Sequence, residues 1–284
     1  MNYYPRTTIV LFLVLFVSTV SFTIFGKKEM KALPKVYREL FGAVPAGEVN
    51  IDGKMQTTTS LFMMQSEVSN KEYRDFLNDL KASGQTQAYD QYKIDSTGWL
   101  QIATYCEPFV TYYHQHPAYD NYPVVNVSYD GALAYAAWLE SKMNVHTAKT
   151  GYSYEVRLPS KAEWIRAANG LQQQSNYAWG GPYVRNAKGC ALCNFNGKLN
   201  AQDTIEVSLY HDDDAMITAP SKSYFPNVFG LYNLNGNVEE MVQERGIAMG
   251  GSWRSPADAV LNTSETNYTN PSPTLGFRCV VVLR

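Results

Sequence analysis

The chain begins with an apolar run and a basic stretch. Ile9 to Phe25 is apolar apart from four Ser and Thr residues, and three lysines follow it, at Lys27, Lys28 and Lys31. A run of about 17 residues is long for a signal-peptide core and short for a membrane span. Residues 1–26 are therefore predicted to be a signal peptide or a membrane anchor. Both interpretations predict an exported protein, either in the periplasm or anchored in a membrane and facing the periplasm.

Three helices are predicted from the spacing of apolar residues beyond the run. Ser69 with Glu72, and Ser160 with Glu163, have the three-residue spacing of a capping box, in which serine and glutamate satisfy backbone amides reciprocally. Apolar residues follow each box at helical spacing, and a glycine stands where the second of these helices should end. Between the two, Ser128 is predicted to cap a helix over residues 129–142.

Strand patterns are short and lie far apart. The best are residues 59–64, 154–157 and 277–283, while the rest of the chain is rich in Gly, Asn, Asp and Pro. Residues 27–41 are predicted to be a basic, partly helical connector, and residues 42–284 a single domain. The fold class expected is α+β, compact and rich in ordered loops.

The composition argues against some classes of function, but it does not indicate a particular one. The formal net charge is −2, so there is no general electrostatic reason to bind nucleic acid. The chain has 21 Tyr, 12 Phe and 5 Trp, which we interpret mainly as the packing of irregular loops, with a carbohydrate-binding face as the alternative. Four cysteines in an exported chain are disulfide candidates, namely Cys106, Cys190, Cys193 and Cys279. Their connectivity stays open.

An ordered series of short motifs decides the family. Along the chain these are Val44-Pro45-Ala46-Gly47, residues 67–73, residues 123–129, Arg157-Leu158-Pro159-Ser160, Tyr177-Ala178-Trp179-Gly180, residues 227–240, Gly250-Gly251-Ser252-Trp253-Arg254 and Gly276-Phe277-Arg278-Cys279. In this order they resemble the formylglycine-generating-enzyme, or sulfatase-modifying-factor, domain family over roughly residues 42–284. The resemblance implies a compact α+β fold with similarity to C-type lectins, often with bound calcium.

The resemblance also implies a chemistry, and the residues for it are missing. Enzymes of this family oxidise a peptide cysteine to formylglycine with a copper ion held by two cysteine thiolates, because soft Cu(I) prefers sulfur ligands. The first cysteine follows the Gly-Gly-Ser serine by three residues and the second lies five further on. Here those positions hold Ser255 and Val260. A serine hydroxyl stays protonated near neutral pH, and valine has no donor atom. We therefore expect no catalytic residues, no bound copper and no oxidase activity.

The resemblance implies two calcium sites that do not depend on the cysteines. One would use the Asn194 side chain, the Phe195 carbonyl, Asp213 and the Ala215 carbonyl, and the other Asn237 and Glu240. An acidic surface turn is the alternative interpretation of the first site. The family usually has a tryptophan before the last glutamate, and Glu239 stands there instead.

Three functions are compatible with these observations. The first is a non-catalytic scaffold or interaction protein of a bacterial envelope, since non-catalytic relatives of this domain occur among gliding-motility and type IX secretion components. Its partners would then be cell-envelope proteins, with secretion or motility components among them, and the membrane if the N-terminal segment is retained. The second is an enzyme of altered chemistry on the same fold. The third is a glycan- or peptide-binding module.

Overall fold

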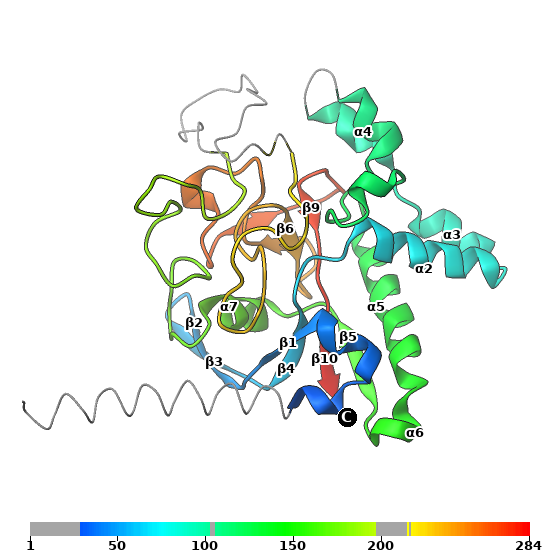
Figure 1. Ribbon diagram of the computed structural model, residues 1–284, viewed down its shortest axis with the longest axis horizontal. Helices are drawn as coiled ribbons and strands as arrows, with labels where there is room; N and C mark the ends of the chain where they lie inside the picture. The colour runs from blue at the N-terminus through cyan, green and yellow to red at the C-terminus, as the bar shows by residue number, and fades with distance from the viewer. Residues whose placement is uncertain (1–28, 103–105, 197–214, 216) are drawn as a thin grey trace, which may run out of the picture.

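The computed structural model describes residues 29–102, 106–196, 215 and 217–284 (Figure 1). Its centre is a four-stranded antiparallel sheet in the order β1-β4-β10-β5. These strands are β1 (Phe41–Val44), β4 (Leu61–Met64), β10 (Val280–Leu283) and β5 (Tyr154–Arg157). The last strand of the chain thus lies between an early strand and one from the middle, which joins the two ends of the domain.

Two smaller sheets complete the strand structure. The hairpin of β2 (Gly47–Ile51) and β3 (Lys54–Thr58) stands by itself. The other sheet has the order β8-β7-β6-β9. Its strands are β6 (Glu239–Met241), β7 (Ile247–Met249), β8 (Glu265–Asn267) and β9 (Leu275–Gly276). None of these six strands is among the three that the apolar pattern predicts.

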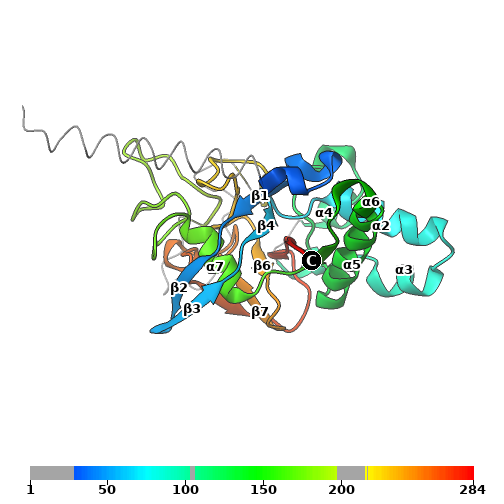
Figure 2. The same cartoon turned by 90° about the horizontal axis from the view of Figure 1, so that it is seen from below.

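Helices gather on one side of the central sheet and loops on the other (Figures 1 and 2). The helical side holds α2 (Asn70–Ala82), α3 (Thr86–Tyr92), α4 (Glu107–Tyr112), α5 (Tyr129–Asn144) and α6 (Thr147–Thr150). On the other side α7 (Lys161–Asn169) packs near the hairpin of β2 and β3. Short 3₁₀ helices connect these elements, at Met30–Ala32 (η1), Lys35–Leu40 (η2), Ser96–Gln101 (η3), Pro117–Tyr119 (η4) and Ala257–Ala259 (η5).

The predicted helix caps are present. Ser69 and Ser160 each accept a hydrogen bond from the amide three residues on, and the carboxylates of Glu72 and Glu163 each accept one from the serine amide. Ser128 caps α5 through the amide of Gly131. α7 ends at Gly170, whose φ of 63° suits glycine. The α+β fold class is confirmed.

The segment predicted as a connector packs on the domain where it is described. Leu33 is fully buried in the main apolar cluster, and the Tyr154 hydroxyl donates to the Ala32 carbonyl at 2.8 Å. Phe41 already belongs to β1. The apolar run at residues 9–25 lies outside the described residues. Among the helices that the structure describes, none is long and apolar enough to cross a membrane.

Candidate functional site

A buried ion pair joins the strands to the loops. The Arg278 guanidinium donates to both carboxylate oxygens of Glu240, with N–O distances of 2.6 and 2.7 Å, and both side chains are almost completely buried. The same guanidinium donates to the carbonyls of Met64 and Tyr232. Trp164 of α7 donates its indole N–H to Glu240 at 2.8 Å. A bidentate pair in a dry interior is strongly directional, so it fixes these segments relative to one another.

A second carboxyl group lies close to this pair. Glu67 is fully buried and accepts a 2.7 Å hydrogen bond from the Asn237 side-chain amide. Burial raises the pKa of Glu67 to about 8. The Arg278 charge lowers this pKa by a smaller amount, and the Glu240 charge raises it further by a smaller amount still. Near neutral pH Glu67 is therefore largely protonated, and only Arg278 and Glu240 carry charge.

Asn237 connects this cluster to the loops that contain Ala219 and Asn194. The Asn237 side-chain oxygen accepts from the Ala219 amide at 2.7 Å, and its backbone amide donates to the Asn194 carbonyl at 2.8 Å. Asn237 and Asn233 have φ values of 63° and 51°, the left-handed region that asparagine tolerates better than most residues. Gly236 must be glycine, because a Cβ there would stand 2.1 Å from the Asn194 carbonyl oxygen.

The Gly-Gly-Ser loop closes beside these asparagines. Gly251 has a φ of 66° and faces the Ala259 carbonyl. Ser252 donates its backbone amide to the Ser255 hydroxyl at 2.9 Å, and the Ser255 amide donates back to the Ser252 carbonyl at 2.9 Å. Ser255 therefore stabilises a tight turn. Val260 is fully buried in an apolar cluster with Tyr177, Cys193 and Phe195.

A model of the sulfatase-modifying factor enzyme 1-like domain matches residues 27–283. The chain belongs to this family. The formylglycine-generating enzyme of Thermomonospora curvata is 35% identical over 141 residues, which cover 49% of this chain and 39% of that relative. The inactive C-alpha-formylglycine-generating enzyme 2 of Bos taurus is 26% identical over 247 residues, which cover 75% of this chain and 74% of that relative. The crystal structure of CarF has a similar fold, with a TM-score of 0.54 at 19% identity over 84% of this chain and 97% of that one.

The family assignment made from the motifs is thus confirmed, and both active and inactive relatives exist within it. The narrower resemblance to gliding-motility and type IX secretion relatives stays a prediction. At the two positions where the resemblance places the family's cysteines, the structure shows a hydrogen-bonded Ser255 and a buried Val260. Neither side chain offers a thiolate to a metal ion.

Three residues of the first predicted calcium site, Asn194, Phe195 and Ala215, lie in the described part of the chain. Asn194 is fully buried, and its side-chain oxygen has no hydrogen-bond partner in the structure. An orphaned buried oxygen is the type of ligand that Ca²⁺ prefers. Phe195 follows Asn194 in the chain, and Asp213 lies outside the described residues.

The second predicted calcium site does not fit the structure. Both Glu240 oxygens are taken by Arg278 and Trp164, and the Asn237 oxygen is taken by backbone and side-chain amides. Glu240 thus pairs with a cationic guanidinium, and the Asn237 oxygen accepts from two N–H groups, so neither side chain offers a free oxygen to a metal ion. Among residues 29–102, 106–196, 215 and 217–284, no three His, Cys, Asp or Glu side chains form a metal-binding group.

The cysteines are not joined in the structure. All four lie in its described part and none forms a disulfide. Cys279 is buried in the main core, Cys106 and Cys193 in two other clusters, and Cys190 is exposed. The structure therefore does not bring Cys279 together with any other cysteine. Burial raises the pKa of the Cys279 thiol well above its usual range, so it is a poor nucleophile.

Sequence reasoning missed Glu67 and Arg278. Both stand inside motifs that identify the family, but each motif is short and says nothing about which distant segment it contacts. The available signal was at Phe277-Arg278-Cys279, where a charged residue stands between apolar ones within a predicted strand. A charged side chain on a buried strand needs a partner of opposite charge.

Replacing Arg278 tests the ion pair. Arg278→Met leaves Glu240 charged and buried without its partner, so we expect a loss of about 3–5 kcal/mol in the free energy of unfolding. The control is Arg284→Met, which removes an exposed pair with Glu155 and should cost at most about 1 kcal/mol. Urea denaturation of the two variants measures the difference. Equal losses would show that the buried pair is not a principal constraint.

Replacing Glu67 tests its raised pKa. A carboxyl that titrates near 8 when folded and near 4.5 when unfolded binds an extra proton in the folded state between these pH values. The contribution of Glu67 to the free energy of unfolding is therefore greatest below pH 4.5 and falls as the pH rises to 8. The slope should reach about 1.4 kcal/mol per pH unit. Glu67→Gln should flatten it between pH 5 and 8, whereas Glu48→Gln, at an exposed position, should not. Identical pH profiles of wild type and Glu67→Gln would contradict this assignment.

Proposed function

We propose that the protein is a non-catalytic member of its family that acts as a scaffold or interaction protein in a cell envelope. The observation that carries the proposal is the state of the two cysteine positions. Ser255 is used to hold a turn and Val260 is sealed in an apolar cluster. The existence of relatives named as inactive supports the same conclusion.

The polar network supports a structural use of the fold. Glu67, Asn237, Glu240 and Arg278 satisfy one another and tie loops from distant parts of the chain to the central sheet. A rigid, loop-rich surface of this kind suits recognition, because loops present varied side chains while the scaffold beneath them stays fixed. We further propose envelope proteins as the partners, with secretion or motility components first among them. That choice rests on the sequence resemblance alone.

A cavity favours a second function, the binding of a glycan or peptide. It has a volume of about 530 Å³ and is lined by Phe109, Tyr119, Tyr122 and the segment around Thr218. The volume lies within the range of ligand-binding cavities, and aromatic walls with hydroxyl groups suit sugars and extended peptides.

The experiment that tests the proposal is a native pull-down from solubilised envelopes, with the protein tagged at Arg284. The proposal predicts stoichiometric recovery of envelope proteins. In parallel, the purified protein, incubated with Cu(I), oxygen and a peptide carrying the sulfatase cysteine motif, should form no formylglycine by mass spectrometry, while a family enzyme run beside it should. Formylglycine formation would overturn the non-catalytic assignment. Recovery of the tagged protein alone would favour the ligand-binding function.

We also propose that Asn194 holds a calcium ion, with Phe195, Asp213 and Ala215 as the other ligands. Calcium would coordinate the buried Asn194 oxygen, which has no hydrogen-bond partner. We expect 1 mM Ca²⁺ to raise the midpoint of thermal unfolding by several degrees, because a ligand that binds only the folded state stabilises it. Asn194→Ala should abolish the rise, and Asn196→Ala should keep it. An equal rise in all three proteins would place the calcium elsewhere.

A further inference from the structure

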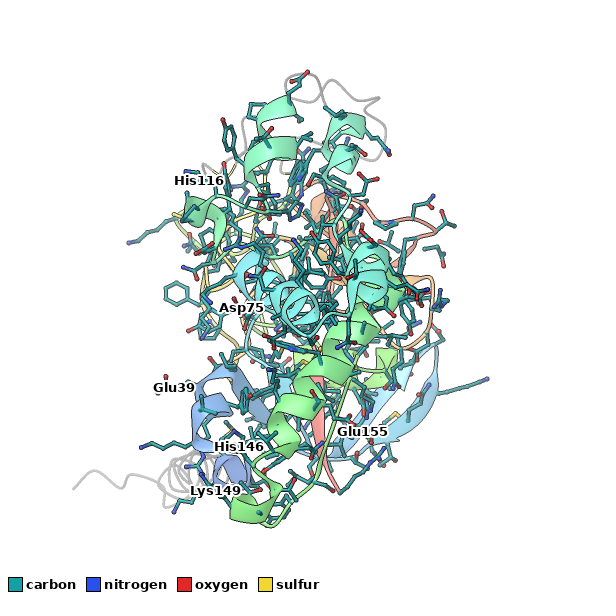
Figure 3. The ribbon with its side chains drawn as sticks, turned by 90° about the vertical axis from the view of Figure 1, so that its right-hand side faces the viewer. Glu39, Asp75, His116, His146, Lys149 and Glu155 are labelled. Atoms are coloured by element: carbon teal, nitrogen blue, oxygen red, sulfur yellow. The ribbon has the colours of Figure 1, made fainter. Side chains whose placement is uncertain are left out.

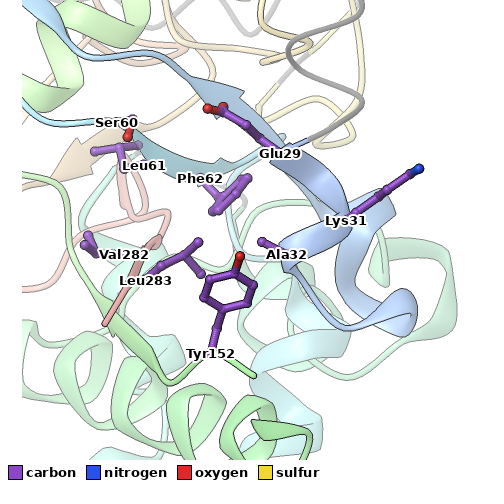
Figure 4. Close-up of a pocket in the computed structure, with 9 residues that line it drawn as sticks. All are labelled: Glu29, Lys31, Ala32, Ser60, Leu61, Phe62, Tyr152, Val282 and Leu283. Atoms are coloured by element: carbon purple, nitrogen blue, oxygen red, sulfur yellow. The ribbon is translucent and has the colours of Figure 1, made fainter. Parts of the chain in front are cut away.

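A cavity lies at the N-terminal end of the domain. Its volume is about 610 Å³ (Figure 4). Ala32 of η1, Phe62 of β4, Leu283 of β10 and Tyr152 point into it, while the Lys31 side chain points away. The walls are mainly apolar side chains, so the cavity favours an apolar occupant.

The cavity stands close to the apolar run in the sequence. The run ends at Phe25, and the first lining residue is Glu29. Four residues span at most about 14 Å when fully extended. If the run inserts into a membrane, the cavity must therefore lie at the membrane surface.

The surroundings of the cavity suit a membrane surface independently of that distance. η2 packs against the junction of α5 and α6, where the Tyr37 and His146 rings are 6.0 Å apart. This end of the molecule, which carries His146 and Lys149 in Figure 3, exposes apolar side chains beside lysines. The apolar ones are Val36, Val145 and Tyr152, with 67%, 74% and 42% of their surface exposed, and the lysines of η1 and η2 are exposed as well.

That combination of residues indicates an anionic lipid surface. A tyrosine such as Tyr152 prefers the membrane interface. Residues 27–40 contain five basic and two acidic side chains, which attracts anionic headgroups. We propose that the cavity takes an acyl chain of a phospholipid from the membrane that holds residues 9–25. This inference rests on the proposed envelope function and on retention of the N-terminal segment.

Photo-crosslinking of the full chain in phospholipid nanodiscs tests the proposal. Tyr152 is replaced by the photoreactive p-benzoylphenylalanine, and the control carries it in place of Tyr183, which is 73% exposed and is not among the residues that line the cavity. After irradiation, mass spectrometry should find a phospholipid adduct at position 152 and at least five-fold less at 183. Ala32→Phe, which fills the cavity, should lower the adduct at 152 by a similar factor, and its melting temperature shows whether it is folded.

Three results would overturn the proposal. Equal adducts at positions 152 and 183 would show unspecific lipid contact. An adduct between position 152 and a peptide from residues 1–28 would show that the chain itself fills the cavity. A purified chain that starts beyond residue 26 would show that the segment is removed. The pull-down from solubilised envelopes distinguishes failure of the lipid proposal from failure of the proposed function, because the recovery of partner proteins does not depend on a lipid in the cavity.

Discussion

The Arg278–Glu240 pair is the interaction on which the rest of the structure depends. A charged pair taken out of water is stable only if its geometry is good and its remaining hydrogen-bonding groups are satisfied. Here the guanidinium also donates to the Met64 and Tyr232 carbonyls, and the carboxylate also accepts from Trp164. These contacts join β4, β6 and α7 to the segment before β10. The loop at Tyr232 has little regular structure of its own, and its carbonyl is held by the Arg278 guanidinium.

The junction explains how the family's fold persists here without the family's cysteines. Ser255 and Val260 lie in a loop that takes no part in the ion pair, and they are held by a local turn and by an apolar cluster. A residue other than cysteine at position 255 or 260 therefore does not affect the contacts of the Arg278–Glu240 pair. The ion pair and the turn at Ser255 are thus held by different contacts.

The family and the helices α2, α5 and α7 could be predicted from the sequence, whereas α3, α4, α6 and the junction could not. Capping boxes at Ser69 and Ser160 are local signals, as the structure confirms. The short strands β6 to β9 are held by long-range pairing, and a three-residue strand such as Glu239–Met241 has too few positions for an alternating pattern to show. The partner of Glu240 could not be predicted either. The family resemblance implies a calcium ion as its partner, whereas in the structure its carboxylate accepts from Arg278.

The most direct test of the central claim is a titration with Cu(I) against a competing chelator under reducing conditions, on the wild-type protein and on a variant with Ser255→Cys and Val260→Cys. The wild-type protein should not hold one equivalent of copper against the chelator, because neither Ser255 nor Val260 carries a thiol. Tight binding of one equivalent by the wild-type protein would contradict the non-catalytic assignment. It would show that other thiols have taken over the metal site and that the protein should be studied as an enzyme.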